Sequence, residues 1–370
     1  MKIVADQNLT GVAEIFGGLG ELELVDGRSL CAEQLAGVDV LLLRSVTRVD
    51  AGLLALHNPD FVGTATSGID HIDRPELERR NIGFAYAPGS NADSVVDYVL
   101  SAIANTDNML ERLLAGERCG IIGYGYIGRR LDERLRALGI ECCAYDPWLE
   151  STATPTLCSL EQVLECPVLS LHAELTRRQP WPSHHMLEAS HLQQMPENSL
   201  LINAGRGELI GTAELLQLDA ARPDMSLVLD VWEQEPRPDP GLLARARFGT
   251  AHIAGYSYDG KLRATRMLYQ SLAQLRRFDP VDPGPVLAPL EVEVPPQLES
   301  ASLLRWLLLQ VYDIHEDDAA LRQQLEGPGD FDPLRKHYRQ RRELGALSIS
   351  NLQALSASAQ SLCNALIKVV

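Results

Sequence analysis

The chain has 370 residues, of which 45% are hydrophobic and 22% charged, and 33 Lys and Arg against 50 Asp and Glu give a formal net charge of −17. This acidity argues against a nucleic-acid partner and against an anionic membrane surface. The length predicts two or three domains of about 150 residues each. The N-terminus is not typical of a signal peptide, and no apolar run approaches the roughly 20 residues of a membrane helix, so we expect a cytoplasmic protein.

The seven cysteines are scattered and contain no Cys-x-x-Cys pair. This pattern predicts neither a zinc site nor a disulfide framework, and it fits a reducing compartment. Four histidines lie close together in sequence: His172, His184, His185 and His191. Because no cysteine or paired carboxylate stands at ligand spacing from them, no metal site is predicted.

Short apolar runs alternate with helix-like stretches from the start to about residue 88. The runs are residues 2–5, 38–43, 61–65 and 83–87. Such alternation is typical of an α/β layer with a parallel sheet. A helix is predicted to follow, and the residues expected on its apolar face are Val95, Val96, Val99, Leu100 and Ile103.

A second α/β series then begins, and its six expected strands predict a doubly wound sheet. These are residues 118–123, 141–145, 168–172, 199–203, 227–231 and a short run near residue 251. A helical segment at 261–277 and a Pro-rich stretch at 278–297 follow. The stretch is typical of a linker or strap, so residues 280–370 are predicted to form a small third domain.

The sequence Gly123-Tyr-Gly125-Tyr-Ile-Gly128 lies between an expected strand and an expected helix. In this context the glycines allow a tight turn, close approach of a pyrophosphate and close packing of helix on strand. The helix N-terminus then offers N–H groups to the phosphates. Asp146 ends the next strand, where a carboxylate binds ribose hydroxyls and repels a 2′-phosphate, so NAD is predicted rather than NADP. The alternative is an ordinary turn without ligand, with Asp146 as a helix cap.

Three polar segments follow later strands of the same sheet and supply Arg206, Glu235 and His252. Ligands bind outside the carboxyl ends of such strands, so these side chains are expected in one crevice. The arginine is suited to hold a substrate carboxylate, the histidine to exchange the proton of a C2 hydroxyl during hydride transfer, and the glutamate to orient the imidazole. Taken singly, each residue also fits a surface or loop role.

These motifs resemble the D-2-hydroxyacid dehydrogenase family over about the first 280 residues. The resemblance implies an NAD-dependent enzyme with a Rossmann-type doubly wound NAD-binding domain at 94–256. It also implies a flavodoxin-like substrate domain at 1–93, to which about 257–279 returns, and a cleft between the two. Arg206, Glu235 and His252 match the family's catalytic residues. The implied cofactor-binding residues are Gly123, Gly125, Tyr126, Ile127, Gly128, Asp146, Asp230 and Gly255.

One departure concerns the loop after the third strand of the second series. The family usually places a threonine there that contacts the cofactor, whereas this chain has Ala173. Position 173 is therefore not predicted to contact NAD.

Further segments are similar to a branch of the family that oxidises a phosphorylated four-carbon 2-hydroxy acid. They are residues 41–49, 61–73, 87–99, 252–265 and 331–343. This similarity implies that Ser45, Thr66 and Tyr256 bind this small-molecule substrate, and that 280–370 is an α+β dimerisation domain of a homodimer. Turn-capping hydroxyls are the alternative for Ser45 and Thr66.

A phosphorylated substrate needs cations, and Arg44 is one candidate. Another is the densest basic run of the chain, formed by Arg335, Lys336, Arg339, Arg341 and Arg342. A solvated helix face is the alternative for this run. Two other functions remain open, namely a related dehydrogenase for phosphoglycerate or an unphosphorylated hydroxy acid, and a non-catalytic NAD-sensing protein.

Overall fold

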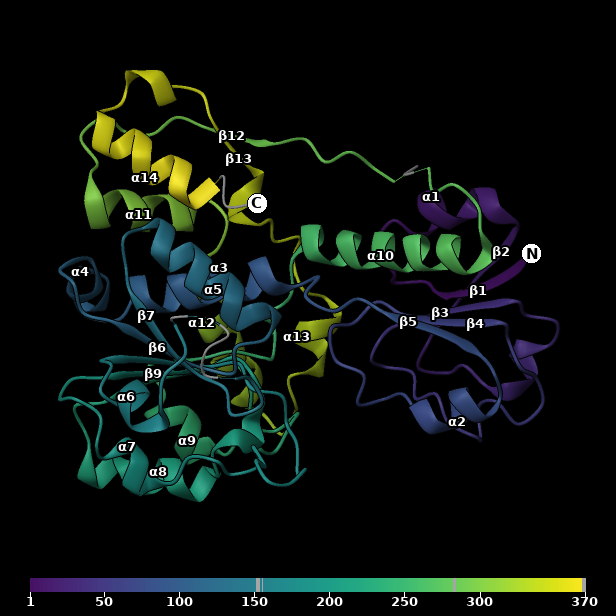
Figure 1. The fold of residues 1–370 in the computed structure, drawn as a ribbon, viewed down its shortest axis with the longest axis horizontal. Coiled ribbons are helices and arrows are strands. Elements are labelled where there is room, and N and C mark those ends of the chain that lie inside the picture. Colours follow the sequence, from purple (N-terminus) through teal and green to yellow (C-terminus); the bar gives the residue numbers. More distant parts are fainter. Residues whose placement is uncertain (151–153, 155, 282–283, 368–370) are drawn as a thin grey trace. The chain divides into compact units, whose positions relative to one another are not determined.

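The computed structural model describes residues 1–150, 154, 156–281 and 284–367. The chain divides into two compact units. The first unit comprises Met1–Asn91 and Ser257–Ala288, and the second comprises Ala92–Tyr256 and Pro289–Val370. Each unit is built around a parallel sheet (Figure 1), so the predicted α/β class is confirmed.

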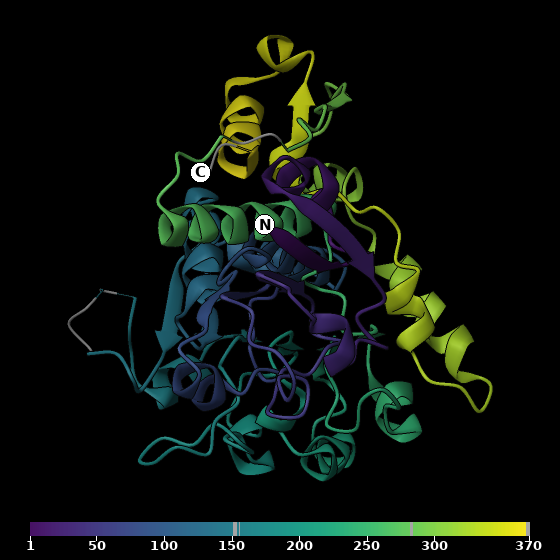
Figure 2. The same ribbon diagram turned by 90° about the vertical axis from the view of Figure 1, so that its right-hand side faces the viewer.

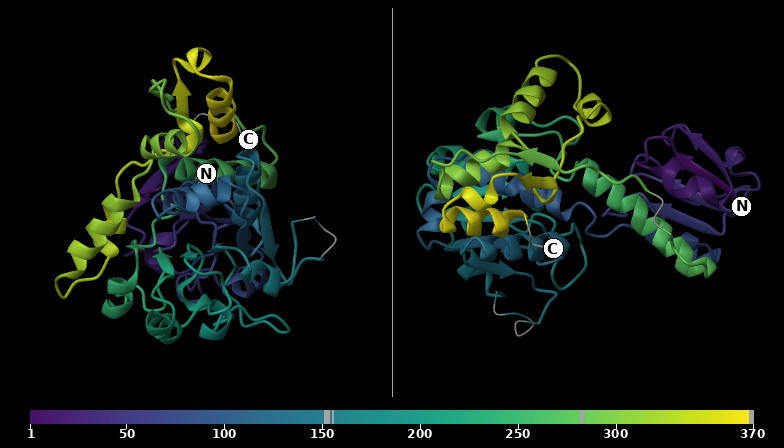
Figure 3. Two further views of the ribbon diagram at one scale, coloured as in Figure 1. Left: turned by 90° about the vertical axis from the view of Figure 1, so that its left-hand side faces the viewer. Right: turned by 90° about the horizontal axis from the view of Figure 1, so that it is seen from above.

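The sheet of the first unit has the strand order β2-β1-β3-β4-β5, which is the flavodoxin-like order. Its strands are β1 (Lys2–Asp6), β2 (Glu21–Val25), β3 (Val40–Leu43), β4 (Phe61–Thr64) and β5 (Gly83–Tyr86). Ile3 and Ala5 belong to the core beneath α1 (Val12–Phe16) and α10 (Tyr258–Arg276), whereas Val4 belongs to the core beneath α2 (Arg74–Arg79). The right-hand view of Figure 3 shows α10, in green, beside this sheet. Because both faces are covered, the inner strands are continuous apolar runs.

Strand β2 was not predicted from the sequence. Its residues are Glu-Leu-Glu-Leu-Val, and both glutamates are exposed. The strand pairs with β1 and lies at the sheet edge, where one face is solvated and the apolar run is therefore interrupted.

The sheet of the second unit has the order β11-β10-β9-β8-β6-β7. Its strands are β6 (Cys119–Ile122), β7 (Cys142–Tyr145), β8 (Val168–Leu171), β9 (Leu200–Asn203), β10 (Ser226–Leu229) and β11 (Phe248–Gly249). The order reverses at β6, between β7 and β8, which is where a doubly wound sheet binds its ligand. The doubly wound prediction is confirmed, but the last strand ends two residues before the expected run near residue 251.

The helices associated with this sheet precede and connect its strands. They are α3 (Ala92–Ala104), α4 (Met109–Leu114), α5 (Tyr126–Ala137), α6 (Leu160–Leu164), α7 (Ala189–Leu192), α8 (Thr212–Ala221) and α9 (Pro240–Arg245). The five residues predicted for the apolar face of α3 are buried, and so is every other residue of this helix except Asp93. Helix α3 contacts β9 and α5, and its other sides are covered by helices from the C-terminal segment.

The C-terminal segment packs into the same unit. Its elements are β12 (Leu290–Val292), α11 (Ser300–Leu309), α12 (Ile314–Leu325), α13 (Asp332–Lys336), β13 (Leu347–Ile349) and α14 (Ala357–Ile367). Strands β12 and β13 pair in parallel. Figure 2 shows the yellow C-terminal part of the chain, in which β13 is drawn as an arrow. Leu303 and Phe331 are fully buried in one core together with residues of the six-stranded sheet. Separate folding of 280–370 and its role in dimerisation stay predictions.

A disulfide joins Cys143 to Cys158, contrary to the expectation drawn from the scattered cysteines. The segment before Cys158 runs beside β7, since Leu157 forms a bridge with Ala144, and this places the two Cα atoms 6.1 Å apart. The other five cysteines are free. Within the described ranges, no helix combines the length and the apolar character needed to cross a membrane.

Candidate active site

The glycine turn joins β6 to α5 and leaves the helix N-terminus open. Gly123 has a φ of +90°, and a Cβ there would lie 2.4 Å from the main-chain nitrogen of Ala173. A Cβ on Gly128 would lie 2.2 Å from the carbonyl oxygen of Gly123, whereas one on Gly125 would meet nothing within 4 Å. The first and third glycines are thus required by packing, and the second faces open space beside uncapped N–H groups. These residues fit a dinucleotide pyrophosphate.

Asp146 follows β7 and is fixed next to this turn. Its Oδ2 accepts a 2.9 Å hydrogen bond from the N–H of Tyr124, and its Oδ1 accepts one of 3.1 Å from the N–H of Trp148. Each carboxylate oxygen retains a lone pair for a ribose hydroxyl. At the start of α5, Tyr126 is 64% exposed and Ile127 is partly buried. The contacts of these three residues with NAD stay predictions.

His252 and Glu235 form a hydrogen-bonded pair. Nδ1 of His252 lies 2.8 Å from Oε2 of Glu235, while Oε1 of Glu235 accepts from the N–H of Trp232 at 3.1 Å. Burial alone would raise the pKa of the Glu235 carboxyl, but its hydrogen bond to His252 and the charge of that residue hold the pKa below its usual value. The Glu235 carboxylate is therefore ionised and is hydrogen-bonded to Nδ1 of His252. Nε2 is then the imidazole nitrogen that can exchange a proton with a substrate.

Asp230 anchors the turn that carries His252. The Asp230 carboxylate is buried and accepts hydrogen bonds from Oγ1 of Thr250 at 2.6 Å and from the N–H groups of Ile253 and Ala254 at 2.8 and 2.9 Å. His252 has a φ of +55°, an uncommon conformation for a residue with a side chain, so the turn needs such support. The predicted contact of Asp230 with NAD remains untested.

Sequence reasoning missed two residues behind this turn. The hydroxyl of Tyr98, on α3, lies 2.9 Å from Oγ1 of Thr250, and Oγ of Ser94 donates to the carbonyl of Ala254 at 2.8 Å. Both come from a helix about 150 residues away along the chain, and no local pattern marks them. The half-buried Gly255 follows this supported turn, and its predicted cofactor contact is likewise untested.

Arg206 follows β9, next to the strand that precedes Glu235. Its Nη1 donates to the carbonyl of Gly205 at 2.9 Å, and its own carbonyl accepts from Nδ2 of Asn203 at 3.0 Å. A Cβ on Gly207 would lie 2.0 Å from the carbonyl carbon of Trp232, so the segment after Arg206 packs directly on the loop that leads to Glu235. The structure therefore brings the segments of all three predicted catalytic residues together within one unit.

The predicted substrate-binding residues fall in both units. Ser45 and Thr66 lie in the first unit just after β3 and β4, which pair in parallel, so both lie at the same edge of that sheet. Oγ1 of Thr66 donates to the carbonyl of Gly68 at 2.7 Å and lies 3.0 Å from Oγ1 of Thr64. Tyr256 belongs to the second unit, and its ring packs edge-on against Tyr338, with centroids 5.7 Å apart.

The two candidate sources of phosphate-binding cations differ in their surroundings. Nε of Arg44 lies 3.1 Å from Oδ2 of the fully buried Asp6. Arg339 pairs with Asp317 and Glu316, and the buried Arg341 donates to the carbonyl of Ser94. The alternative interpretation of the basic run as one solvated helix face is therefore wrong, because α13 ends at Lys336 and Arg341 is only 2% exposed.

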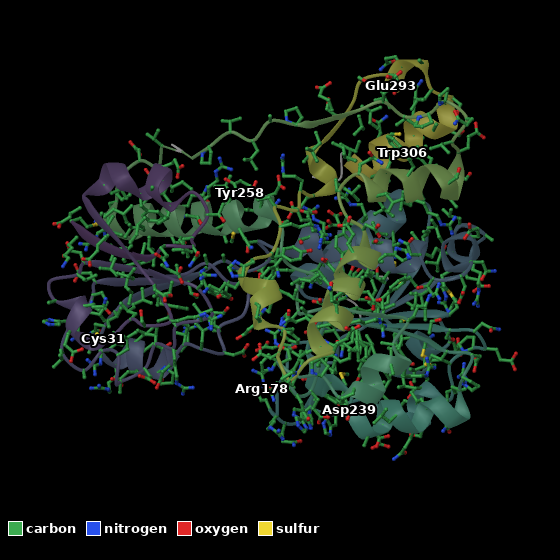
Figure 4. All side chains as sticks on the ribbon, turned by 180° about the vertical axis from the view of Figure 1, so that it is seen from behind. Cys31, Arg178, Asp239, Tyr258, Glu293 and Trp306 are labelled. Carbon is green, nitrogen blue, oxygen red and sulfur yellow. A yellow bond between two sulfur atoms is a disulfide. The ribbon has the colours of Figure 1, made fainter. Side chains whose placement is uncertain are left out.

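The loop after β8 carries the atypical sequence and most of the clustered histidines. Oγ of Ser183 closes the loop through a 2.8 Å hydrogen bond from the N–H of Thr176. The guanidinium of Arg178, which is labelled in Figure 4, lies over the ring of Trp148. His185 pairs with Glu233 at 2.8 Å, and burial lowers the pKa of His172 to about 3. Among the described side chains, no three potential metal ligands come together.

Known proteins share both parts of this architecture. Residues 94–254 match the family described as D-isomer specific 2-hydroxyacid dehydrogenase, NAD binding domain, and residues 285–365 match a domain of unknown function. An erythronate-4-phosphate dehydrogenase of Cellvibrio japonicus is 44% identical over 359 residues, covering 93% of each chain. One from Serratia proteamaculans is 41% identical over 363 residues, covering 96% of this chain and 97% of that protein. The chain therefore belongs to the D-isomer specific 2-hydroxyacid dehydrogenase family and, within it, groups with the erythronate-4-phosphate dehydrogenases.

Solved structures support the same fold. NAD⁺-bound 3-phosphoglycerate dehydrogenase of Entamoeba histolytica aligns with a TM-score of 0.60 at 22% identity, covering 74% of this chain and 94% of that chain. D-Lactate dehydrogenase of Aquifex aeolicus aligns with a TM-score of 0.59 at 20% identity, covering 75% and 96%. Together with the family match, the turn at 123–128 and Asp146 identify an NAD-dependent dehydrogenase.

Proposed function

We propose that this enzyme oxidises 4-phospho-D-erythronate to (R)-3-hydroxy-2-oxo-4-phosphobutanoate with NAD, a step in the biosynthesis of pyridoxal 5′-phosphate. One observation carries the proposal: the chain is 38–44% identical in sequence to erythronate-4-phosphate dehydrogenases over more than nine tenths of its length. The hydrogen-bonded pair of His252 and Glu235 supports it, because oxidation of a C2 hydroxyl needs a positioned base.

The roles of the side chains follow from their contacts. When bound, NAD accepts the hydride that leaves C2. His252 takes the proton of the C2 hydroxyl at Nε2, and the ionised Glu235 stabilises the resulting imidazolium through Nδ1. Arg206 holds the substrate carboxylate through its guanidinium fork and polarises the C2 oxygen. One hydride and one proton thus leave the alcohol, giving the 2-oxo acid and NADH.

The experiment is a comparison of NADH formation from 4-phosphoerythronate, 3-phosphoglycerate and D-lactate by the purified full chain. We expect the highest kcat/KM for 4-phosphoerythronate. A higher value for 3-phosphoglycerate would assign the enzyme to the related dehydrogenases. Binding of NAD without turnover of any of the three acids would favour the NAD-sensing alternative.

The assembly and location of the enzyme belong to the same proposal. We infer a cytoplasmic homodimer, in which residues 280–370 form the dimer contact. The 48% exposed Leu309 on α11 offers apolar surface to a second copy. Sedimentation equilibrium of the wild type and of Leu309→Glu tests the dimer. We expect a twofold mass for the wild type and a monomer for the variant.

A further inference from the structure

Helix α13 brings one cation of the basic run to the residues around His252. Phe331, next to the first residue of α13, is fully buried, and its N–H donates to the carbonyl of Pro236, which directly follows Glu235, at 3.2 Å. One turn later, Nε of Arg335 donates to the hydroxyl oxygen of Tyr256 at 3.2 Å, and the guanidinium carbon lies 5.7 Å from that ring's centroid. The helix therefore contacts both the glutamate loop and the segment after His252.

Arg335 differs from its neighbours in how its charge is balanced. Arg339 forms a short hydrogen bond of 2.5 Å to Asp317, while Arg341 stacks on Tyr312 and donates to main-chain carbonyls. In the described part of the chain, the carboxylate oxygen nearest to the Arg335 guanidinium belongs to Asp332, at 3.9 Å, which is longer than a hydrogen bond. Arg335 is thus a largely buried cation, with 25% of its side chain exposed, and no carboxylate of the described residues lies within hydrogen-bond distance of its guanidinium.

The electrostatic surroundings keep this cation charged and connect it to the catalytic pair. Burial by itself would lower the pKa of Arg335, but the Tyr256 hydroxyl and the Glu235 carboxylate hold the pKa above its usual value. The charge of Arg335 in turn helps to hold the pKa of the Glu235 carboxyl down. The guanidinium therefore lies within the field of the group that orients His252.

We propose that Arg335 binds the phosphate of the substrate and so determines the preference for a phosphorylated acid. This inference rests on the proposed function. Nε is used by Tyr256, which leaves the four N–H groups of Nη1 and Nη2 to donate to phosphate oxygens. Since Arg206 is assigned to the C1 carboxylate, a second fixed cation is needed for the second anionic group of the substrate. Its supply by the C-terminal segment gives that segment a direct role in recognition.

The test compares binding of 4-phosphoerythronate and of unphosphorylated D-erythronate by calorimetry to the complex of the enzyme with NADH, in which neither acid can be oxidised. The proteins are the wild type, Arg335→Gln, Arg335→Lys and Lys336→Gln. Lys336 is the matched control, because it is an exposed cation one residue further along α13. Thermal unfolding of each variant checks that the fold is retained, and NADH formation by the wild type tests the proposed function separately.

We expect Arg335→Gln to weaken binding of 4-phosphoerythronate about 10- to 100-fold, the cost of losing hydrogen bonds to a charged group, and to change binding of erythronate much less. Arg335→Lys should recover part of the loss, and Lys336→Gln should match the wild type. An equal loss for both acids, or equal binding of both by the wild type, would overturn the assignment. In the first case Arg335 would act only through Tyr256.

Discussion

Nδ1 of His252 lies 2.8 Å from Oε2 of Glu235, although the two residues are 17 positions apart and follow different strands. The contact exists because β10 and β11 are adjacent and parallel, so the segments that follow them leave the same edge of the sheet. Glu235 is further fixed by the N–H of Trp232. The pair is therefore preorganised before any substrate arrives.

Glu235→Gln removes the charge of Glu235 but keeps the shape of the side chain. The variant therefore separates the orientation of the His252 imidazole from the electrostatic stabilisation of the imidazolium. In Glu235→Gln the amide still orients the imidazole but no longer stabilises the imidazolium, so we expect kcat to fall about tenfold or more. Steady-state kinetics measure this. Glu233→Gln is the control, because Glu233 pairs with His185, also at 2.8 Å, in the same loop. Equal losses in the two variants would show that the effect is not specific to His252.

Removal of the imidazole should affect chemistry rather than cofactor binding. For His252→Ala we expect kcat to fall by a factor on the order of 10²–10⁴, the usual contribution of a general base. The Kd for NAD, measured by fluorescence titration, should stay within about twofold of the wild type, because the glycine turn and Asp146 lie elsewhere on the sheet. Near-normal turnover would remove His252 from the proton-transfer role.

Asp146 should determine the choice between NAD and NADP. Asp146→Asn keeps the shape and one acceptor oxygen but loses the charge that repels a 2′-phosphate. We expect the KM for NAD to rise about tenfold and the preference for NAD over NADP to fall by at least as much. The check is kinetics with both cofactors. An unchanged preference would place the ribose away from β7.

The buried Asp97 should make stability depend on pH. Asp97 lies on α3 and accepts the N–H of Leu344 from the C-terminal segment at 2.9 Å. Burial raises its pKa to about 7, although the charge of Arg341 acts in the opposite direction. The folded state therefore retains a proton that the unfolded chain releases. The contribution of Asp97 to the free energy of unfolding is thus fully present below about pH 4 and is lost as the pH rises through 7.

Urea unfolding at several pH values between 4 and 8 measures this effect. The free energy of unfolding of the wild type should decrease relative to that of Asp97→Asn as the pH rises across this window. The asparagine can still accept the N–H of Leu344 but does not titrate. A difference between the two proteins that stays constant with pH would contradict the assignment.

The sequence allowed the two sheets to be predicted because parallel strands covered on both faces are continuous apolar runs. Strand β2 was not predicted, because its alternating glutamates lie at a solvated edge and interrupt the apolar run. The pairing of Cys143 with Cys158 also escaped notice, because it depends on how the segment before Cys158 runs beside β7. Sequence patterns therefore predict which strands are buried, but they do not predict which segments lie side by side in the fold.

The site shows the same limit. The positions of Arg206, Glu235 and His252 after successive strands were enough to place them at one edge. The support of the His252 turn by Tyr98 was not predicted, because α3 is remote in sequence, and Asp230 was predicted only as a cofactor contact. Within the basic run, Arg335 and Arg339 look equivalent in sequence, and only the position of Asp317, 22 residues before Arg339, shows that Arg339 is already paired.

In the proposed reaction, the hydride passes directly from C2 of 4-phosphoerythronate to NAD. The most direct test uses 4-phosphoerythronate carrying deuterium at C2 and determines the mass of the NADH formed by the wild-type enzyme. We expect reduced cofactor that carries one deuterium and is therefore one mass unit heavier than unlabelled NADH. Unlabelled NADH, or no reduction of NAD by this acid, would contradict this transfer.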